Sequence, residues 1–194
     1  MNSSARDAHR AVIALGSNLG DREATIRAAV RDIDAVQGVR VVAASSLVES
    51  GALKPTGVDA AAPAYLNAVI LVETDLTPER LLEEINLIEH DHGRVRDVVW
   101  GDRTLDLDLI TVDDVQLDSE RLTLPHPRAW QRAFVLAPWL QVDPDAVIPD
   151  RGRVADLLSD VQDQVWEFPA EPLHPARHRM AAPTGVPVDD GAPA

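Results

Sequence analysis

Two carboxylates separated by one residue, Asp106 and Asp108, are the side chains in this sequence that are best spaced to do chemistry. They alternate with Leu105, Leu107 and Leu109, so a strand would place the leucines on one face and both acids on the other, about 6.6 Å apart along the chain. Two carboxylates held about 5 Å apart at an effective dielectric near 20 repel by roughly 3 kcal/mol. A partly enclosed pair is therefore stabilised by a cation, and oxygen ligands without His or Cys favour Mg2+ carried with phosphates. The alternative is a solvated face of an edge strand.

Arginines flank this acidic pair on both sides, although the chain as a whole is acidic. The 194 residues include 18 Lys and Arg against 32 Asp and Glu, for a net charge of −14. Residues 93–103 nevertheless carry three Arg against two Asp, and residues 119–134 carry three Arg against one Glu. The planar fork of arginine binds phosphate oxygens. The pattern indicates a metal–triphosphate site, with an ordinary surface ion pair as the alternative for any single Arg.

Six motifs occur in one order between residue 11 and about residue 150. They are ALGSNLGD at 14–21, YLNA at 65–68, Glu89 with GRVR at 93–96, WG at 100–101, RTLDLD at 103–108 and RLTLPH at 121–126. With these motifs the chain resembles the 6-hydroxymethyl-7,8-dihydropterin pyrophosphokinases of folate biosynthesis. The resemblance implies an ATP-dependent transferase that moves pyrophosphate from ATP to the hydroxymethyl group of the reduced pterin and releases AMP.

The resemblance also sorts the candidate site residues into three groups. The catalytic group is Arg94, Arg96, Arg103, Asp106 and Asp108, in which the two Asp would hold two Mg2+ ions. The pterin-binding group is Ser50, Leu53, Tyr65, Asn67 and Phe134. The ATP-binding group is Leu82, Asn86, Glu89, Trp100, Arg103, Leu109, Arg121, Thr123, His126 and Arg132.

The pterin assignment has independent support in the sequence around Tyr65 and Asn67. On a strand these two side chains share one face, and Leu66 and Ala68 share the other. A flat heterocycle can stack on an aromatic ring while an amide donates to and accepts from its edge. The alternative is a half-buried strand with a polar outer face. By the resemblance, Phe134 supplies the second ring.

Three positions depart from the pattern of the family. Ser50-Gly51-Ala52 stands where Thr-Pro-Pro is usual, Val99 replaces a commonly basic residue before the tryptophan, and Asp102 replaces the proline before the arginine. Residues 93–102 have a glycine near each end, which permits large backbone changes, and the equivalent loop of the family moves when ATP binds. We expect Asp102 to weaken nucleotide binding relative to proline. A static surface loop is the alternative.

Several candidate residues also have plainer structural explanations. Glu89 recurs with Leu82 and Asn86 at helical spacing, which is equally typical of an exposed helix face. His126 lies between two prolines, so its ring can be aimed at a phosphate or can be an ordinary surface histidine. The GSNLG stretch at 16–20 lacks the lysine of a phosphate loop, and we interpret it as a tight strand-to-helix turn that lies near the pterin in the family.

Hydrophobic periodicity and turn residues predict a single domain over residues 11–168. Strands are expected at 12–15, 39–47, 65–73 and 104–111, helices at 21–38 and 77–93, and a short helix at 127–130. This βαββαβ order predicts a ferredoxin-like α+β sandwich with helices on one face of an antiparallel sheet. Residues 1–10 are expected to be flexible. Residues 169–194 hold six of the 14 prolines and are expected to be disordered.

Composition excludes several other classes of function. The chain has no cysteine, which excludes disulfides, thiolate zinc sites and cysteine nucleophiles. A pI near 4.7 argues against nucleic-acid binding. No apolar run reaches the ~20 residues that span a membrane, and residues 1–10 lack a signal-peptide core, so the cytoplasm is expected.

The expected partners are ATP and the reduced pterin. The sequence leaves the oligomeric state open, between a monomer and association with neighbouring folate-pathway enzymes. A different class of function also remains open, a non-catalytic ligand-binding module of ferredoxin-like fold whose acids and arginines form regulatory anion sites.

Overall fold

The computed structural model describes residues 8–54, 57–59, 63–93, 104–162 and 164–173, and of residues 52–54 and 57–59 it describes the backbone. Its main sheet has the strand order β12–β3–β6–β1–β7, and β2 also pairs with β6. Every pairing in this sheet is antiparallel. The strands are β1 (His9–Ser17), β2 (Val39–Ala44), β3 (Val48–Ser50), β6 (Tyr65–Thr74), β7 (Asp106–Val112) and β12 (Val165–Glu167). The antiparallel α+β fold predicted from the sequence is confirmed.

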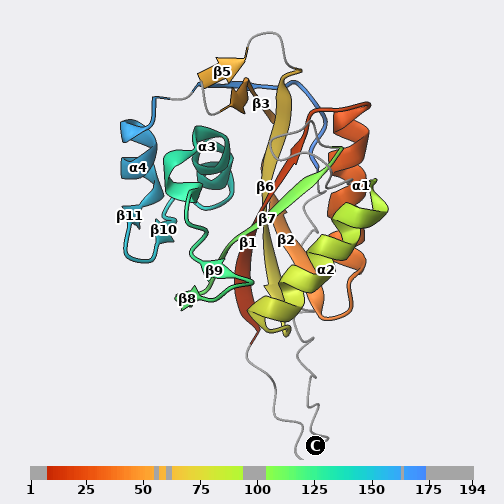
Figure 1. Ribbon diagram of the computed structural model, residues 1–194, viewed down its shortest axis with the longest axis vertical. Helices are drawn as coiled ribbons and strands as arrows, with labels where there is room; N and C mark the ends of the chain where they lie inside the picture. Colours follow the sequence, from red (N-terminus) through yellow and green to blue (C-terminus); the bar gives the residue numbers. More distant parts are fainter. Residues whose placement is uncertain (1–7, 55–56, 60–62, 94–103, 163, 174–194) are drawn as a thin grey trace, which may run out of the picture.

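Two amphipathic helices cover one face of the sheet, as Figure 1 shows. α1 (Arg22–Ala35) begins at Asp21, whose carboxylate accepts the Ala24 amide at 3.0 Å, and it buries the predicted apolar stripe. α2 (Pro78–Asp91) begins at Thr77 with a proline in its first turn. Both helices therefore start where the capping residues predict.

Two further helices, α3 (Ala133–Val142) and α4 (Val154–Asp160), cover the opposite face of the sheet (Figure 1). The expectation of helices on one face only is therefore wrong. α3 is apolar over most of its circumference and contains Pro138, so it lacks the polar stripe by which an amphipathic helix is predicted. The short helix expected at 127–130 is a 3-10 turn, η1 (Ala129–Gln131), which leads directly into α3.

The strands alternate between two apolar cores. Leu105, Leu107 and Leu109 pack in the core beneath α1 and α2, together with Leu66 and Ala68, which confirms the predicted alternation. Their neighbours in sequence on the strands face the other way, towards the core that α3 forms with Val12, Val69 and Ile110. Tyr65 and Asn67 of β6 and Asp106 and Asp108 of β7 therefore lie on the α3 face, towards one end of the sheet.

Three small hairpins complete the described structure. β4 (Ala52–Lys54) pairs with β5 (Gly57–Asp59), between β3 and β6, where the sequence predicted no strand. The other two hairpins are β8 (Leu117–Asp118) with β9 (Thr123–Leu124), and β10 (Val147–Ile148) with β11 (Gly152–Arg153).

The chain packs against the domain beyond the boundary predicted at residue 168. Leu173 is buried in the core beneath α1 and α2, and Arg27 of α1 donates hydrogen bonds to the carbonyls of Glu171 and Pro172. The remainder of the predicted tail, residues 174–194, lies outside the described residues, as do residues 1–7. In the described part of the chain, the helices are all too short or too polar to span a membrane.

Candidate functional site

Three adjacent strands bring Asn67, Gly16 and Asp106 into one row across the sheet. Gly16 of β1 is the register partner of Asn67 in β6 and of Asp106 in β7. A Cβ atom placed on Gly16 would lie 3.4 Å from Oδ1 of Asn67 and 4.0 Å from Cβ of Asp106. With strands about 4.8 Å apart, glycine leaves open the space between the amide and the carboxylate. Gly16 and Ser17 belong to β1, so the predicted turn starts later, at Asn18.

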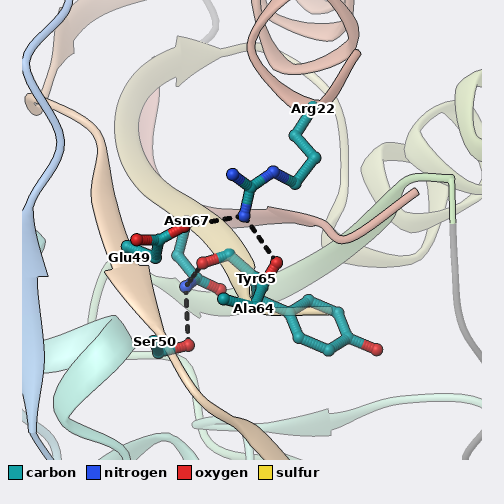
Figure 2. Close-up of polar contacts among 6 residues, drawn as sticks. All are labelled: Arg22, Glu49, Ser50, Ala64, Tyr65 and Asn67. Carbon is teal, nitrogen blue, oxygen red and sulfur yellow. Dashed lines mark hydrogen bonds and ion pairs between the residues drawn. The ribbon is translucent and has the colours of Figure 1, made fainter. Parts of the chain in front are cut away.

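Three of the predicted pterin residues meet at the ends of β3 and β6. Nδ2 of Asn67 donates to Oγ of Ser50 at 2.9 Å (Figure 2), and both side chains are buried. Tyr65 is the register partner of Ser50. Phe134 lies on α3, which covers the same face of the sheet. The side chain of the fifth predicted pterin residue, Leu53, lies outside the described residues.

Asp108 faces two predicted phosphate-binding residues from other segments of the chain. Its Oδ2 lies 3.6 Å from Nη1 of Arg132 and 3.9 Å from Nε2 of His126. The backbone amide of His126 donates to the carbonyl of Ile110 at 2.8 Å. Ile110 is the residue of β7 that has no partner in the pairing of β1 with β7. Arg132 begins α3, and its guanidinium carbon lies 5.4 Å from the centre of the Phe134 ring. The fold thus assembles one acid, one imidazole and one guanidinium.

Burial lowers the pKa of His126 below its ordinary value of 6.5. The neighbouring carboxylate of Asp108 acts in the opposite direction, while the positive charges of Arg132 and Arg128 lower the pKa further. The Arg128 amide approaches Nδ1 of His126 at 3.2 Å as a donor, so we assign the proton of the neutral ring to Nε2, which faces Asp108. Arg128 belongs to the arginine-rich segment at 119–134, but the sequence assigned it no role.

Glu89 holds the backbone that carries the acidic pair. Its side chain is fully buried, and Oε1 accepts the amide of Leu107 at 2.6 Å. Leu107 lies between Asp106 and Asp108 on β7, so this bond fixes the peptide between the two carboxylates. The alternative of an exposed helix face is therefore wrong for Glu89. Leu82 and Asn86 lie on the same helix and are half-buried.

The remaining predicted site residues occupy varied positions. Leu109 is a core side chain, 3% exposed, so a nucleotide can contact it through its backbone. Thr123 of β9 donates to Oδ1 of Asp118 at 3.3 Å, and Arg121 is exposed in the turn before β9. The side chains of Arg94, Arg96, Trp100 and Arg103 lie outside the described residues, as do the Val99 and Asp102 departures.

The acidic pair fits a metal ion that brings other ligands with it. Within the described ranges, no group of three or more His, Cys, Asp or Glu side chains is arranged to hold a metal. Asp106 and Asp108 offer oxygen ligands from one face of β7. Mg2+ is commonly bound by one or two carboxylates with substrate phosphates and water completing its shell, so these donors suit magnesium bound together with a nucleotide.

Comparison with known proteins identifies one family over most of the chain. The model of the family described as 7,8-dihydro-6-hydroxymethylpterin-pyrophosphokinase (HPPK) matches residues 12–144. A 2-amino-4-hydroxy-6-hydroxymethyldihydropteridine pyrophosphokinase from Haemophilus influenzae is 38% identical over 153 residues, which cover 79% of this chain and 93% of that protein. The protein of the same name from Methylorubrum extorquens is 42% identical over 139 residues, 72% of this chain and 85% of that protein.

Solved structures show the same fold at low sequence identity. A Plasmodium falciparum HPPK-DHPS chain, crystallised with pterin and p-hydrobenzoate, superimposes with a TM-score of 0.61 at 13% identity. The match covers 81% of this chain and 45% of that one. The arrangement of sheet and helices is therefore shared with that structure.

Proposed function

The chain belongs to the 7,8-dihydro-6-hydroxymethylpterin-pyrophosphokinase family, and we propose how its described residues transfer pyrophosphate from ATP to 6-hydroxymethyl-7,8-dihydropterin in folate biosynthesis. The observation that carries the proposal is the row of Asn67, Gly16 and Asp106. It places a neutral hydrogen-bonding group and a metal-binding acid on either side of a residue without a side chain. A pterin held at Asn67 would thus present its hydroxymethyl group towards the acids of β7.

The pterin lies over Gly16, with its edge against Asn67. Because Ser50 accepts from Nδ2 of Asn67, the amide is held in one orientation, and Oδ1 is directed to the space above Gly16. Oδ1 then accepts a hydrogen bond from a pterin N–H group. Tyr65 and Phe134 supply aromatic surfaces for the two faces of the ring.

The triphosphate lies over β7, between the acidic pair and the basic side chains of α3 and residues 126–128. Asp106 and Asp108 would hold two Mg2+ ions, which when bound would neutralise phosphate charge and help to orient the reacting groups. Arg132 binds phosphate oxygens. Neutral His126 donates a hydrogen bond from its Nε2–H group to another phosphate oxygen. Glu89 acts as a positioning residue through the Leu107 amide.

The reaction exchanges one phosphorus–oxygen bond for another. The pterin hydroxyl oxygen bonds to the β-phosphorus and releases its proton to water, while the bond from that phosphorus to the oxygen shared with the α-phosphate breaks. That oxygen leaves with AMP. Such transfers depend mainly on positioning and charge stabilisation. By the family resemblance, further side chains add charge beside the ATP and cover it. They are Arg94, Arg96, Trp100 and Arg103, together with Arg121 and Thr123.

The direct test is to incubate the protein with ATP, Mg2+ and the reduced pterin and to measure the products. We expect AMP and the pterin diphosphate in equal amounts, and no AMP when either the pterin or Mg2+ is omitted. A non-catalytic binding module would bind both ligands and release no AMP. Release of ADP would contradict transfer of a pyrophosphoryl group.

The proposal extends to the setting of the reaction. The enzyme works in the cytoplasm as a single domain over residues 11–168, extended by the contacts of residues 169–173. We propose a monomer, in which one chain would supply all the proposed site residues. Association with neighbouring folate enzymes is supported by the 41% identity, over 152 residues, to a Pneumocystis carinii folic acid synthesis protein of which the match covers 20%.

A further inference from the structure

Arg22, in the first turn of α1, joins the ends of two strands that carry the pterin residues. Its Nη1 donates to Oε1 of Glu49 at 2.8 Å and to the carbonyl oxygen of Ala64 at 2.6 Å. Glu49 directly precedes Ser50 in β3, and Ala64 directly precedes Tyr65 in β6. One guanidinium nitrogen therefore links two residues that lie near the two ends of the segment 51–63, which connects β3 to β6.

Arg22 acts from the side of the sheet opposite to the pterin residues. Glu49 is the register partner of Leu66, which packs in the core beneath α1. Ser50 and Asn67 meet on the other side, and in Figure 2 the bonds of Arg22 lead to Glu49 and Ala64 while the amide of Asn67 bonds to Ser50. Arg22 thus cannot touch a pterin lying over Gly16, and any effect it has on the pterin passes through the backbone of β3 and β6.

We infer that Arg22 is a positioning residue for the pterin, which rests on the pterin site proposed above. Arg22 bonds to both the Glu49 carboxylate and the Ala64 carbonyl, so it fixes the distance between these two groups. It thereby fixes the spacing between the end of β3 and the start of β6. That spacing sets the hydrogen bond from Asn67 to Ser50 and the place of the Tyr65 ring. This tie matters at this place because Ser50-Gly51-Ala52, where β3 ends and β4 begins, contains no proline, so the backbone there is not stiffened by its own residues.

The acceptors explain why this position holds an arginine. Glu49 is 34% and Arg22 26% exposed at the side chain, so a simple surface ion pair would contribute little. The additional bond to a backbone carbonyl makes the guanidinium a bridge between two strands. Both bonds come from Nη1, so the single nitrogen of a lysine could also serve both acceptors, but its flexible stem would hold them less rigidly.

Arg27, five residues further along α1, provides a matched control. It also binds a glutamate, Glu23, and two backbone carbonyls, those of Glu171 and Pro172. Its side chain is 22% exposed, close to the value for Arg22. The two arginines therefore differ mainly in what they hold in place, the pterin strands for Arg22 and residues 171–172 for Arg27.

The experiment compares Arg22→Met, Arg22→Lys, Glu49→Gln and Arg27→Met in the full chain. For each variant, melting temperature, kcat and the KM values for pterin and for ATP are measured. We expect Arg22→Met to raise the pterin KM about tenfold, as the loss of roughly two neutral-strength hydrogen bonds would do, with an ATP KM within about twofold of wild type. Lysine should restore part of the loss, and Glu49→Gln should lose less because the Ala64 bond remains.

Several outcomes would overturn the inference. A purely structural role predicts lower melting temperatures for Arg22→Met and Arg27→Met alike, with unchanged pterin KM in both. Equal increases in the KM values for pterin and ATP would also contradict a selective effect. If Arg22→Met does not fold, Glu49→Gln and Arg22→Lys decide the question by the same KM ratio. If wild type forms no AMP the proposed function fails, whereas an active wild type with an unaffected Arg22→Met refutes the positioning role alone.

Discussion

The two ends of the row formed by Asn67, Gly16 and Asp106 are held in different ways. At the β6 end, Asn67 and Ser50 are neutral, buried and joined by a hydrogen bond of 2.9 Å. At the β7 end, Asp108 lies 3.6 Å from Arg132 and 3.9 Å from His126, farther than the 2.7–2.9 Å typical of charge-assisted hydrogen bonds. The side chains of the neutral end are joined by a hydrogen bond, whereas Asp108 at the charged end lies at longer distances from Arg132 and His126.

This difference corresponds to the ligands proposed for the two ends. A pterin brings donors and acceptors of fixed geometry, so a preorganised amide binds it with little rearrangement. A nucleotide with metal ions brings large charges, for which acidic and basic side chains must lie near one another, as Asp108, Arg132 and His126 do. We therefore expect substitutions at the β6 end to affect pterin KM and substitutions at the β7 end to affect kcat.

The largest effect is expected from the acids of β7. Asp106→Asn or Asp108→Asn should each lower kcat at least ~100-fold, equivalent to about 2.7 kcal/mol of barrier, because each removes a charge that holds magnesium. Both side chains face away from the leucine core, so the melting temperature should stay near that of wild type. Steady-state AMP production with saturating substrates measures the change. Near-normal kcat in both variants would contradict the metal assignment and remove the distinction between the two ends.

Gly16→Ala tests whether the substrate lies between the two ends. The added methyl group would contact Oδ1 of Asn67 at 3.4 Å, with the Tyr65 ring and Asp106 within 4.0 Å, so it fits the folded protein but occupies the proposed substrate space. We expect kcat/KM to fall about 30-fold, since misplacement by an ångström can cost up to about 100-fold. The melting temperature should not fall, because glycine weakens a strand interior. An unchanged kcat/KM would mean that the substrate lies elsewhere.

Asn67→Ala tests the neutral end alone. It removes the amide that reads the pterin edge and leaves Ser50 without this donor, so we expect the pterin KM to rise about tenfold. The ATP KM should remain within about twofold of wild type. Ser50→Ala, which removes only the hydroxyl that orients the amide, should produce a smaller change in the same direction. Equal changes in both KM values would show that the two ends do not act separately.

The sequence predicted the parts of this site that depend on local periodicity. The alternation of Asp106 and Asp108 with leucines gave β7 its two faces, and Asp21 and Thr77 marked the starts of α1 and α2, because caps and strand alternation act over a few residues. The face shared by Tyr65 and Asn67 was predicted for the same reason. The roles of the site residues stay predictions.

The missed features depend on contacts between distant segments. α3 lacks an amphipathic stripe because it packs its apolar surface against the sheet as well as against neighbouring segments. Glu89 resembled an exposed helical residue, since its acceptor role towards the Leu107 amide arises only when α2 packs on β7. Arg22 had no role in the sequence analysis, because its acceptors lie 27 and 42 residues away. No local pattern encodes such pairings.

His126 allows the smallest test, because it is the titrating group at the charged end. Burial first, and then the neighbouring arginines, lower its pKa below 6.5 in the folded protein. Between that lowered pKa and about pH 6.5, His126 binds more protons in the unfolded chain than in the folded chain. The contribution of His126 to the free energy of unfolding is therefore fully present above about pH 6.5. It is lost as the pH falls towards the folded-state pKa. Glutamine does not titrate, so His126→Gln should lose less stability than wild type between pH 7 and pH 5, by a difference on the order of 1 kcal/mol or less.

Asn67→Ala is the matched control from the neutral end, and it should lose stability on acidification as wild type does. Thermal unfolding of the three proteins across this pH range measures the difference. Parallel curves for wild type and His126→Gln would show that His126 does not distinguish the charged end from the neutral one.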